Sequence, residues 1–141
     1  LAEDLVYGHQ AEYIRYFIDS NARNPLAITD EAVARYAGAY DTRLKLAAGF
    51  ELYRAFDKDA EYFASLNDSF SVPVLLLGAE FSFAQGFPGL SSALQEKGVR
   101  SVSTKIINDS GHWVAEEQPI QTASLILDFA QQAVGKSFKT E

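Results

Sequence analysis

Apolar residues in the first half of the chain recur at helical spacing, and short polar breaks separate the helices that this spacing predicts. Residues 2–20 place their large apolar side chains at intervals near 3.6, which predicts one amphipathic helix that ends before the Asn-Pro pair at 24–25. Thr29 is the expected N-cap of a second helix, which runs to about residue 40. Two further helices are expected at residues 43–55 and 59–66. The first half is therefore predicted to be all-helical.

The pattern changes after a polar, turn-prone stretch at residues 67–71. Residues 73–77 are wholly apolar and Gly78 closes the run, as expected of a strand that is buried on both faces of a parallel sheet. The elements expected after it are a long loop (79–89), a helix that stops at Gly98 (90–97), a strand near a sheet edge (99–107) and a last helix that opens with Pro119 (119–134). The order is thus four helices followed by β-α-β-α, which predicts an α/β fold.

Composition and charge exclude several classes of partner. With 48% apolar residues, the 141-residue chain can bury a sizeable core. A formal charge of −7 leaves no basic stripe, so we expect no nucleic acid and no anionic membrane surface as partner. The longest purely apolar run, at 74–77, is far too short to span a bilayer. Because residue 1 is Leu, any leader would precede it; the compartment stays open, with the cytoplasm favoured.

Two histidines and no cysteine limit the chemistry further. His9 and His112 are too far apart in sequence to form a ligand pair at helical spacing, so we predict no metal and no other cofactor. His112 emerges where a β-branched run ends, after Gly111 permits a tight bend. An imidazole held at the end of a strand suits general base catalysis. The alternative is a loop histidine that bonds only to backbone.

Three motifs resemble one known family. Gly111-His112-Trp113, with Ala115-Glu116-Glu117 and Pro119, is similar to the end of an α/β-hydrolase of the epoxide hydrolase and haloacid dehalogenase branch. Residues 72–80 resemble that branch's penultimate strand and acid loop, and residues 49–56 resemble the end of its helical cap. No Gly-x-Asp-x-Gly or Gly-x-Ser-x-Gly nucleophile elbow is present.

The resemblance implies the C-terminal part of an α/β-hydrolase fold whose nucleophile-bearing N-terminal half is absent. Residues 1–68 are then the helical cap, and residues 69–141 are the C-terminal part of the core. Two strands are too few for a stable parallel sheet, so we expect the N-terminal half of the same enzyme or self-association as partner. This chain alone is expected to be inactive.

The family's chemistry implies roles for two residues at the end of the strands. A nucleophilic carboxylate forms an ester with a small-molecule substrate, and His112 matches the base that activates the hydrolytic water. Glu80 lies where the family places the acid that orients this histidine, although the usual residue is Asp and some relatives take the acid from after the sixth strand. A loop carboxylate in water is the alternative for Glu80. Asp109 is expected to make an Asx bond to the backbone of the turn instead.

Tyr53 is the third candidate site residue. Tyr53-Arg54-Ala55 resembles the cap motif whose Tyr hydrogen-bonds the epoxide oxygen, although a core Tyr is the alternative and haloacid dehalogenases use a cap Tyr to hold halide. For Trp113 we expect packing, and for Glu116 and Glu117 contact with solvent or helix capping. Epoxide hydrolysis leads, with haloacid dehalogenase, esterase and a catalytically incomplete interaction protein as alternatives.

Overall fold

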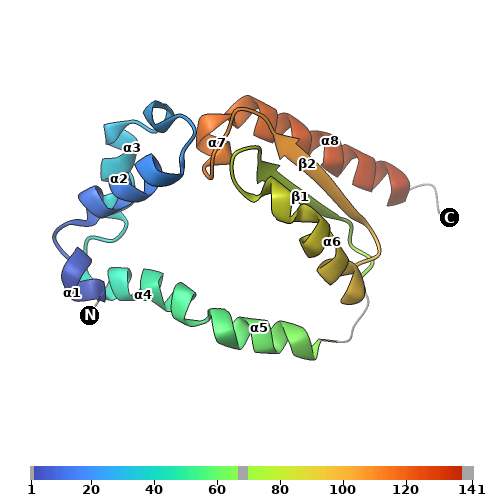
Figure 1. Ribbon diagram of the computed structural model, residues 1–141, viewed down its shortest axis with the longest axis horizontal. Helices are drawn as coiled ribbons and strands as arrows, with labels where there is room; N and C mark the ends of the chain where they lie inside the picture. Colours follow the sequence, from blue (N-terminus) through green and yellow to red (C-terminus); the bar gives the residue numbers. More distant parts are fainter. Residues whose placement is uncertain (1, 67–69, 138–141) are drawn as a thin grey trace. The chain divides into compact units, whose positions relative to one another are not determined.

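The computed structural model describes residues 2–66 and 70–137, which fall into two compact units (Figure 1). The helical unit comprises Leu1–Ser20 and Pro25–Leu66, and the sheet unit comprises Asn21–Asn24 and Asn67–Glu141. The boundary predicted between residues 68 and 69 lies outside the described residues. The chain is mostly helical, and its described strands form one parallel pair, as in part of an α/β fold.

The helical unit is built from short helices. They are α1 (Ala2–Val6), α2 (Gln10–Asn21), the 3-10 helix η1 (Pro25–Ala27), α3 (Asp30–Gly38), α4 (Arg43–Arg54) and α5 (Phe56–Ser65). The prediction of a single helix over residues 2–20 is wrong, because Gly8 adopts a left-handed conformation with φ 89 and separates α1 from α2. The Gln10 side chain supports this break, since its Oε1 accepts the Gly8 N–H at 2.9 Å.

Local capping explains where α3 and α4 begin. The Thr29 side chain accepts the Ala32 N–H, so the predicted N-cap of α3 is confirmed. Thr42 caps α4 in the same way by accepting the Lys45 N–H. Ala55 ends α4 and starts α5 in right-handed helical geometry, so α5 begins at Phe56 rather than at residue 59. The buried residues of this unit are Val6, Ile18, Ile28, Ala32, Val33 and Leu46.

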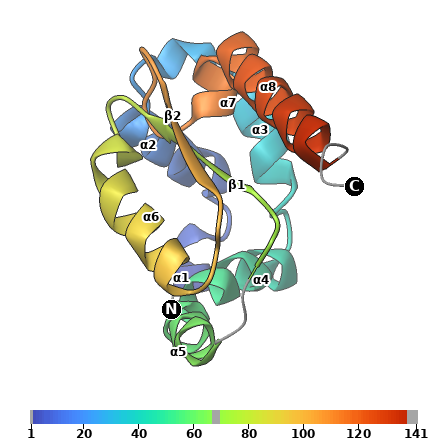
Figure 2. The same ribbon diagram turned by 90° about the vertical axis from the view of Figure 1, so that its right-hand side faces the viewer.

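The sheet unit places two strand ends at one edge. Its elements are β1 (Val74–Ala79), the 3-10 helix η2 (Phe83–Gly86), α6 (Phe87–Glu96), β2 (Val102–Ile107), α7 (Val114–Glu117) and α8 (Pro119–Ser137). β1 and β2 pair in parallel, from Val74 opposite Val102 to Ala79 opposite Ile107. Figures 1 and 2 show α6 and α8 on opposite sides of this strand pair. Because the strands are parallel, the segments that follow them leave the sheet at the same edge.

Three boundaries in the sheet unit differ from the sequence predictions. Gly78 does not close β1 but lies within it, paired with Ile106 of β2. The Phe87 ring occupies the space that a side chain would fill there, with Cζ 2.2 Å from an ideal Cβ. Phe87 also starts α6, with Pro88 in the first turn, so the helix begins three residues before the predicted residue 90. β2 begins at Val102 rather than at residue 99, since Val99 forms an isolated bridge with Phe70.

β1 is less buried than predicted. Residues 74–77 are half-buried, because β1 has one neighbouring strand among the described residues. Ile106 in β2 is 49% exposed, whereas Ile107 is fully buried. In the part of the chain that the structure describes, no helix is both long and apolar enough to cross a membrane.

Candidate active site

His112 lies in the turn at residues 108–113, which joins β2 to α7. His112 is exposed, and its imidazole lies beside two aromatic rings. The Trp113 ring is perpendicular to it with a centroid distance of 4.9 Å, and the Phe83 ring from η2 is tilted at 6.0 Å. The sequence pattern had not singled out Phe83, because its place beside the imidazole depends on the short helix η2. The turn therefore presents His112 to solvent at the carboxyl edge of the strand pair.

Backbone hydrogen bonds join the end of β1 to this turn. Glu80 N donates to Ile107 O at 3.0 Å, and Phe81 N donates to Ser110 O at 3.1 Å. Ser110 is fully buried, and its Oγ donates to Ile107 O at 2.9 Å. These hydrogen bonds fix the two strand ends to one another. Loops that carry functional residues are commonly positioned by a rigid scaffold in this way.

Glu80 is attached to the turn through its side chain. Its Oε2 accepts the Asp109 N–H at 3.0 Å, and the residue is exposed. No hydrogen bond joins the Glu80 carboxylate to the His112 imidazole within residues 2–66 and 70–137. Both residues nevertheless follow the carboxyl ends of the parallel strands, and therefore lie at the same edge of the sheet.

Asp109 supports the turn with its backbone. It is left-handed, with φ 52, and its carbonyl accepts a bond from Gln118 Nε2 at 3.2 Å. Its carboxylate forms no hydrogen bond among the described residues, so the predicted Asx bond is not formed.

Glu117, expected to contact solvent or to cap a helix, is a buried carboxylate. It is 9% exposed, and its Oε1 accepts the N–H groups of Gly111 and Trp113 at 3.0 and 3.3 Å. Its Oε2 accepts the N–H groups of Arg23 and Asn24 at 2.7 and 2.8 Å. The sequence contained no signal for this role, because the adjacent Glu116 has the same chemistry and only the fold determines which one turns inward.

Residues 21–24 pack against the His112 turn. His112 N donates to Asn21 O at 2.8 Å. An ideal Cβ on Gly111 would lie 2.4 Å from both Arg23 N and Asn21 O, closer than real Cβ atoms approach. Gly111 is therefore required by this close approach of two backbones, whereas the left-handed residue of the turn is Asp109.

Tyr53 belongs to the helical unit, near the end of α4. Its side chain is 68% exposed, and its ring contacts that of Phe56 at a centroid distance of 5.4 Å. The next residue, Arg54, donates to Glu51 at 2.6 Å and to Glu3 of α1 at 2.5 Å. The Glu3 pKa falls to about 2 because its carboxylate accepts a backbone hydrogen bond and one from the Arg54 guanidinium. Hydrogen bonds to the carboxylates of Glu3 and Glu51 raise the Arg54 pKa. Arg54 thus links the end of α4, which carries Tyr53, to α1.

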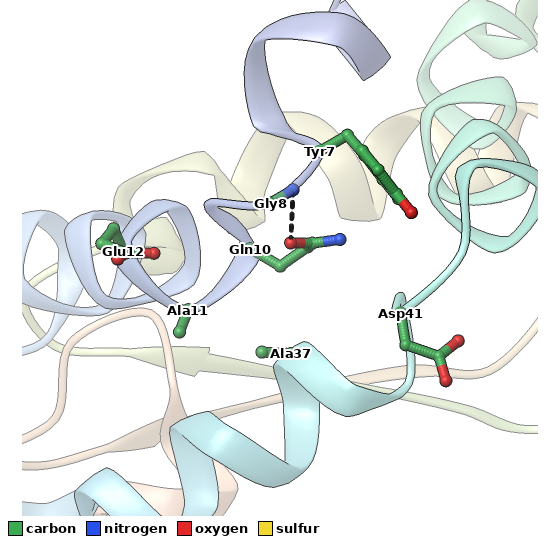
Figure 3. A pocket seen from close by; sticks show the side chains of 7 residues that line it. All are labelled: Tyr7, Gly8, Gln10, Ala11, Glu12, Ala37 and Asp41. Atoms are coloured by element: carbon green, nitrogen blue, oxygen red, sulfur yellow. Dashed lines mark hydrogen bonds between the residues drawn. The ribbon is translucent and has the colours of Figure 1, made fainter.

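An open pocket of about 500 Å³ lies elsewhere in the helical unit (Figure 3). Its lining residues are Tyr7, Gly8, Gln10, Ala11, Glu12, Ala37 and Asp41. Gln10 crosses it by accepting the Gly8 N–H and donating to Tyr40 O. None of the three predicted site residues lines this pocket. The described residues contain no group of three or more His, Cys, Asp or Glu side chains that could hold a metal ion.

Solved structures of two proteins are similar to this chain. Cfl2 from Burkholderia cenocepacia matches 92% of the chain at 29% sequence identity with a TM-score of 0.79, and the chain covers 43% of Cfl2. The epoxide hydrolase CorEH matches 96% of the chain at 24% identity with a TM-score of 0.76, and the chain covers 46% of CorEH. Sequence comparison matches no described family and no curated protein. The similarity supports an epoxide hydrolase-like, partial α/β fold, and the chain spans less than half the length of either structure.

Proposed function

We propose that the protein containing this chain hydrolyses epoxides through an ester intermediate, with His112 as the base that activates water. The observation that carries the proposal is the position of His112, which is exposed in a turn at the carboxyl edge of a parallel strand pair. In open α/β sheets, ligands bind at that edge. The similarity to CorEH supports the fold on which this chemistry would operate.

The reaction proceeds in two steps. In the first, a carboxylate on a nucleophile elbow outside this chain attacks an epoxide carbon, an ester bond forms, and the ring C–O bond breaks. The Tyr53 phenol donates a hydrogen bond to the departing ring oxygen and then its proton. In the second, His112 removes a proton from water, whose oxygen attacks the ester carbonyl. The acyl C–O bond breaks, the resulting carboxylic acid gives its proton to the departing alkoxide, and the diol leaves. The proton taken by His112 returns to the Tyr53 phenolate through solvent, so the carboxylate, the imidazole and the phenol are all restored.

Glu80 is proposed as the acid that orients His112. The Oε2 atom of its carboxylate accepts the N–H of Asp109, which lies three residues before His112 in the same turn. Oε1 forms no hydrogen bond among the described residues and is therefore available to accept an imidazole N–H. Such a bond would fix the tautomer of the imidazole and stabilise the imidazolium that forms when water is deprotonated.

The Tyr53-Arg54-Ala55 motif favours epoxides over the haloacid and ester substrates of the same fold. Arg54 supports this role because its bonds to Glu3 and Glu51 fix the segment that carries the phenol. The alternative is a catalytically incomplete interaction protein. It would require an elbow residue other than Asp or Ser.

Single turnover in oxygen-18 water tests the proposal. With enzyme in excess over an epoxide, the ester route predicts that the first diol carries unlabelled oxygen from the enzyme carboxylate, and that the label enters the protein. Label in the first diol would mean direct attack of water on the epoxide and would contradict the ester route. Turnover of a 2-haloacid or a simple ester in place of every epoxide tested would reassign the substrate class.

A further inference from the structure

We propose that Glu117 is the positioning residue for His112. Its carboxylate holds the turn at residues 108–113 against residues 21–24, so that the imidazole is aligned with the water that it activates. This inference rests on the function proposed above for His112. It adds a residue whose role depends on backbone hydrogen bonds and not on contact with substrate.

The bonds to Oε1 lie on both sides of the histidine. Gly111 N and Trp113 N donate to this one oxygen, and His112 N between them donates to Asn21 O. Three consecutive backbone amides therefore point to fixed acceptors. A backbone bonded at three successive positions cannot rotate the Cα of His112 without breaking at least one bond, so the direction in which the imidazole leaves the turn is fixed.

The bonds to Oε2 join this turn to a segment far away in the sequence. Arg23 N and Asn24 N donate to Oε2, across 94 and 93 residues. The close approach at Gly111 brings the two segments into backbone contact at the same place. Glu117 thus acts as a clamp: its Oε1 binds the His112 turn, and its Oε2 binds residues 21–24.

A carboxylate is the side chain that satisfies four donors in this arrangement. When ionised it offers two oxygens and only accepts hydrogen bonds, whereas an amide must direct its NH₂ at one of the two donor pairs. The partners of Glu117 in the described residues are backbone amides, and the Arg23 guanidinium lies over the Phe81 ring, 4.5 Å from its centroid. Removing the acceptor would leave partly buried N–H groups unpaired, which is costly.

The test compares Glu117→Gln with Glu116→Gln in the full-length enzyme. Glu116→Gln is the matched control, because it removes the same charge one residue earlier. Amide hydrogen exchange at Gly111 and Trp113 is measured first, since it reports the clamp without any substrate. We expect exchange about tenfold faster or more in Glu117→Gln, which corresponds to about 1.4 kcal/mol, and no change in the control.

Single-turnover kinetics then separates positioning from general loss of folding. Misplacing His112 slows hydrolysis of the ester while alkylation stays within about twofold, so the ester accumulates. Loss of folded protein would lower the amplitude of both steps equally. Glu117→Asp keeps the charge with a shorter reach and provides a second variant if the Gln form does not fold; we expect it to slow hydrolysis less.

Each outcome decides one claim. Unchanged exchange in both Glu117 variants would overturn the clamp, and faster exchange with normal hydrolysis would overturn its role in positioning His112. Failure of the wild-type enzyme to form any ester would contradict the proposed function, and the exchange rates would still decide whether Glu117 holds the turn.

Discussion

Gly111→Ala tests the docking of the His112 turn on residues 21–24. The added Cβ would lie 2.4 Å from Arg23 N and Asn21 O and 2.8 Å from Ala22 C. All three are backbone atoms, which cannot rotate away as the end of a side chain can. Ordinary contact requires the two segments to separate by about 1 Å.

That separation has a cost that can be worked out from the contacts. The His112 N to Asn21 O bond is 2.8 Å long and would be broken by such a shift, and the bonds from Gly111 and Arg23 to Glu117 would be strained. Overpacking typically costs about 1–3 kcal/mol, and a lost hydrogen bond adds about 1 kcal/mol. We therefore expect Gly111→Ala to lower the free energy of unfolding by about 2–4 kcal/mol.

Urea unfolding followed by Trp113 fluorescence measures this change, because the sole tryptophan is two residues from the substitution. Gly89→Ala is the matched control: it lies in α6, a Cβ there meets nothing within 4 Å, and we expect stability to be unchanged or raised by up to about 1 kcal/mol. Gly111→Ala with the same unfolding free energy as wild type, within about 0.5 kcal/mol, would refute the close approach of the two backbones.

Four further results are expected. Thr29→Ala removes the side-chain cap of α3 and should lower the free energy of unfolding of the helical unit by about 1 kcal/mol in urea; no change would mean that the cap bond is not formed in solution. Because the Glu3 pKa is about 2 in the folded chain against an ordinary 4.5, its contribution to stability is present above pH 4.5 and is lost as pH falls to about 2. Melting temperatures of Glu3→Gln should therefore depend less on pH than wild type over that window, and identical pH profiles would contradict the backbone and Arg54 hydrogen bonds that lower the Glu3 pKa. Tyr53→Phe should slow alkylation by roughly 10²–10³, or about 2.7–4 kcal/mol in the barrier, whereas Tyr62→Phe, which is equally exposed at 68%, should not; equal rates in the two variants would remove Tyr53 from ring opening. The chain itself, with half-buried strands, should be oligomeric by light scattering or should bind the N-terminal half of the enzyme, and a cooperative monomer at micromolar concentration would contradict this.

Local signals in the sequence predicted the helices whose ends are set by neighbouring residues. Thr29 defines the start of α3 because its hydroxyl reaches an amide three residues ahead. Gly98, with φ 84, stops α6 for a similarly local reason. The break at Gly8 was missed because the apolar spacing continues across it from α1 to α2.

Long-range contacts account for what the sequence could not predict. Gly78 was expected to end a strand, but its pairing with Ile106 of the distant strand β2 keeps it within β1. Glu117 is one of two adjacent glutamates, and the sequence alone does not distinguish them. Its role in holding the His112 turn depends on residues 21–24, which are distant in sequence and donate to its carboxylate. Glu80 and His112 were assigned to one site from the resemblance to the family, and the parallel register of β1 and β2 places the ends of their strands at the same edge.

Intact-mass spectrometry of His112→Gln during turnover of an epoxide is the most direct test of the proposed role of His112. His9→Gln is the matched control, because His9 is the other histidine of the chain and lies between α1 and α2. If His112 activates the hydrolytic water, the His112 variant gains the mass of the epoxide and keeps it, while the His9 variant turns over like wild type and shows no adduct. Normal diol production by His112→Gln, with no adduct, would contradict the account.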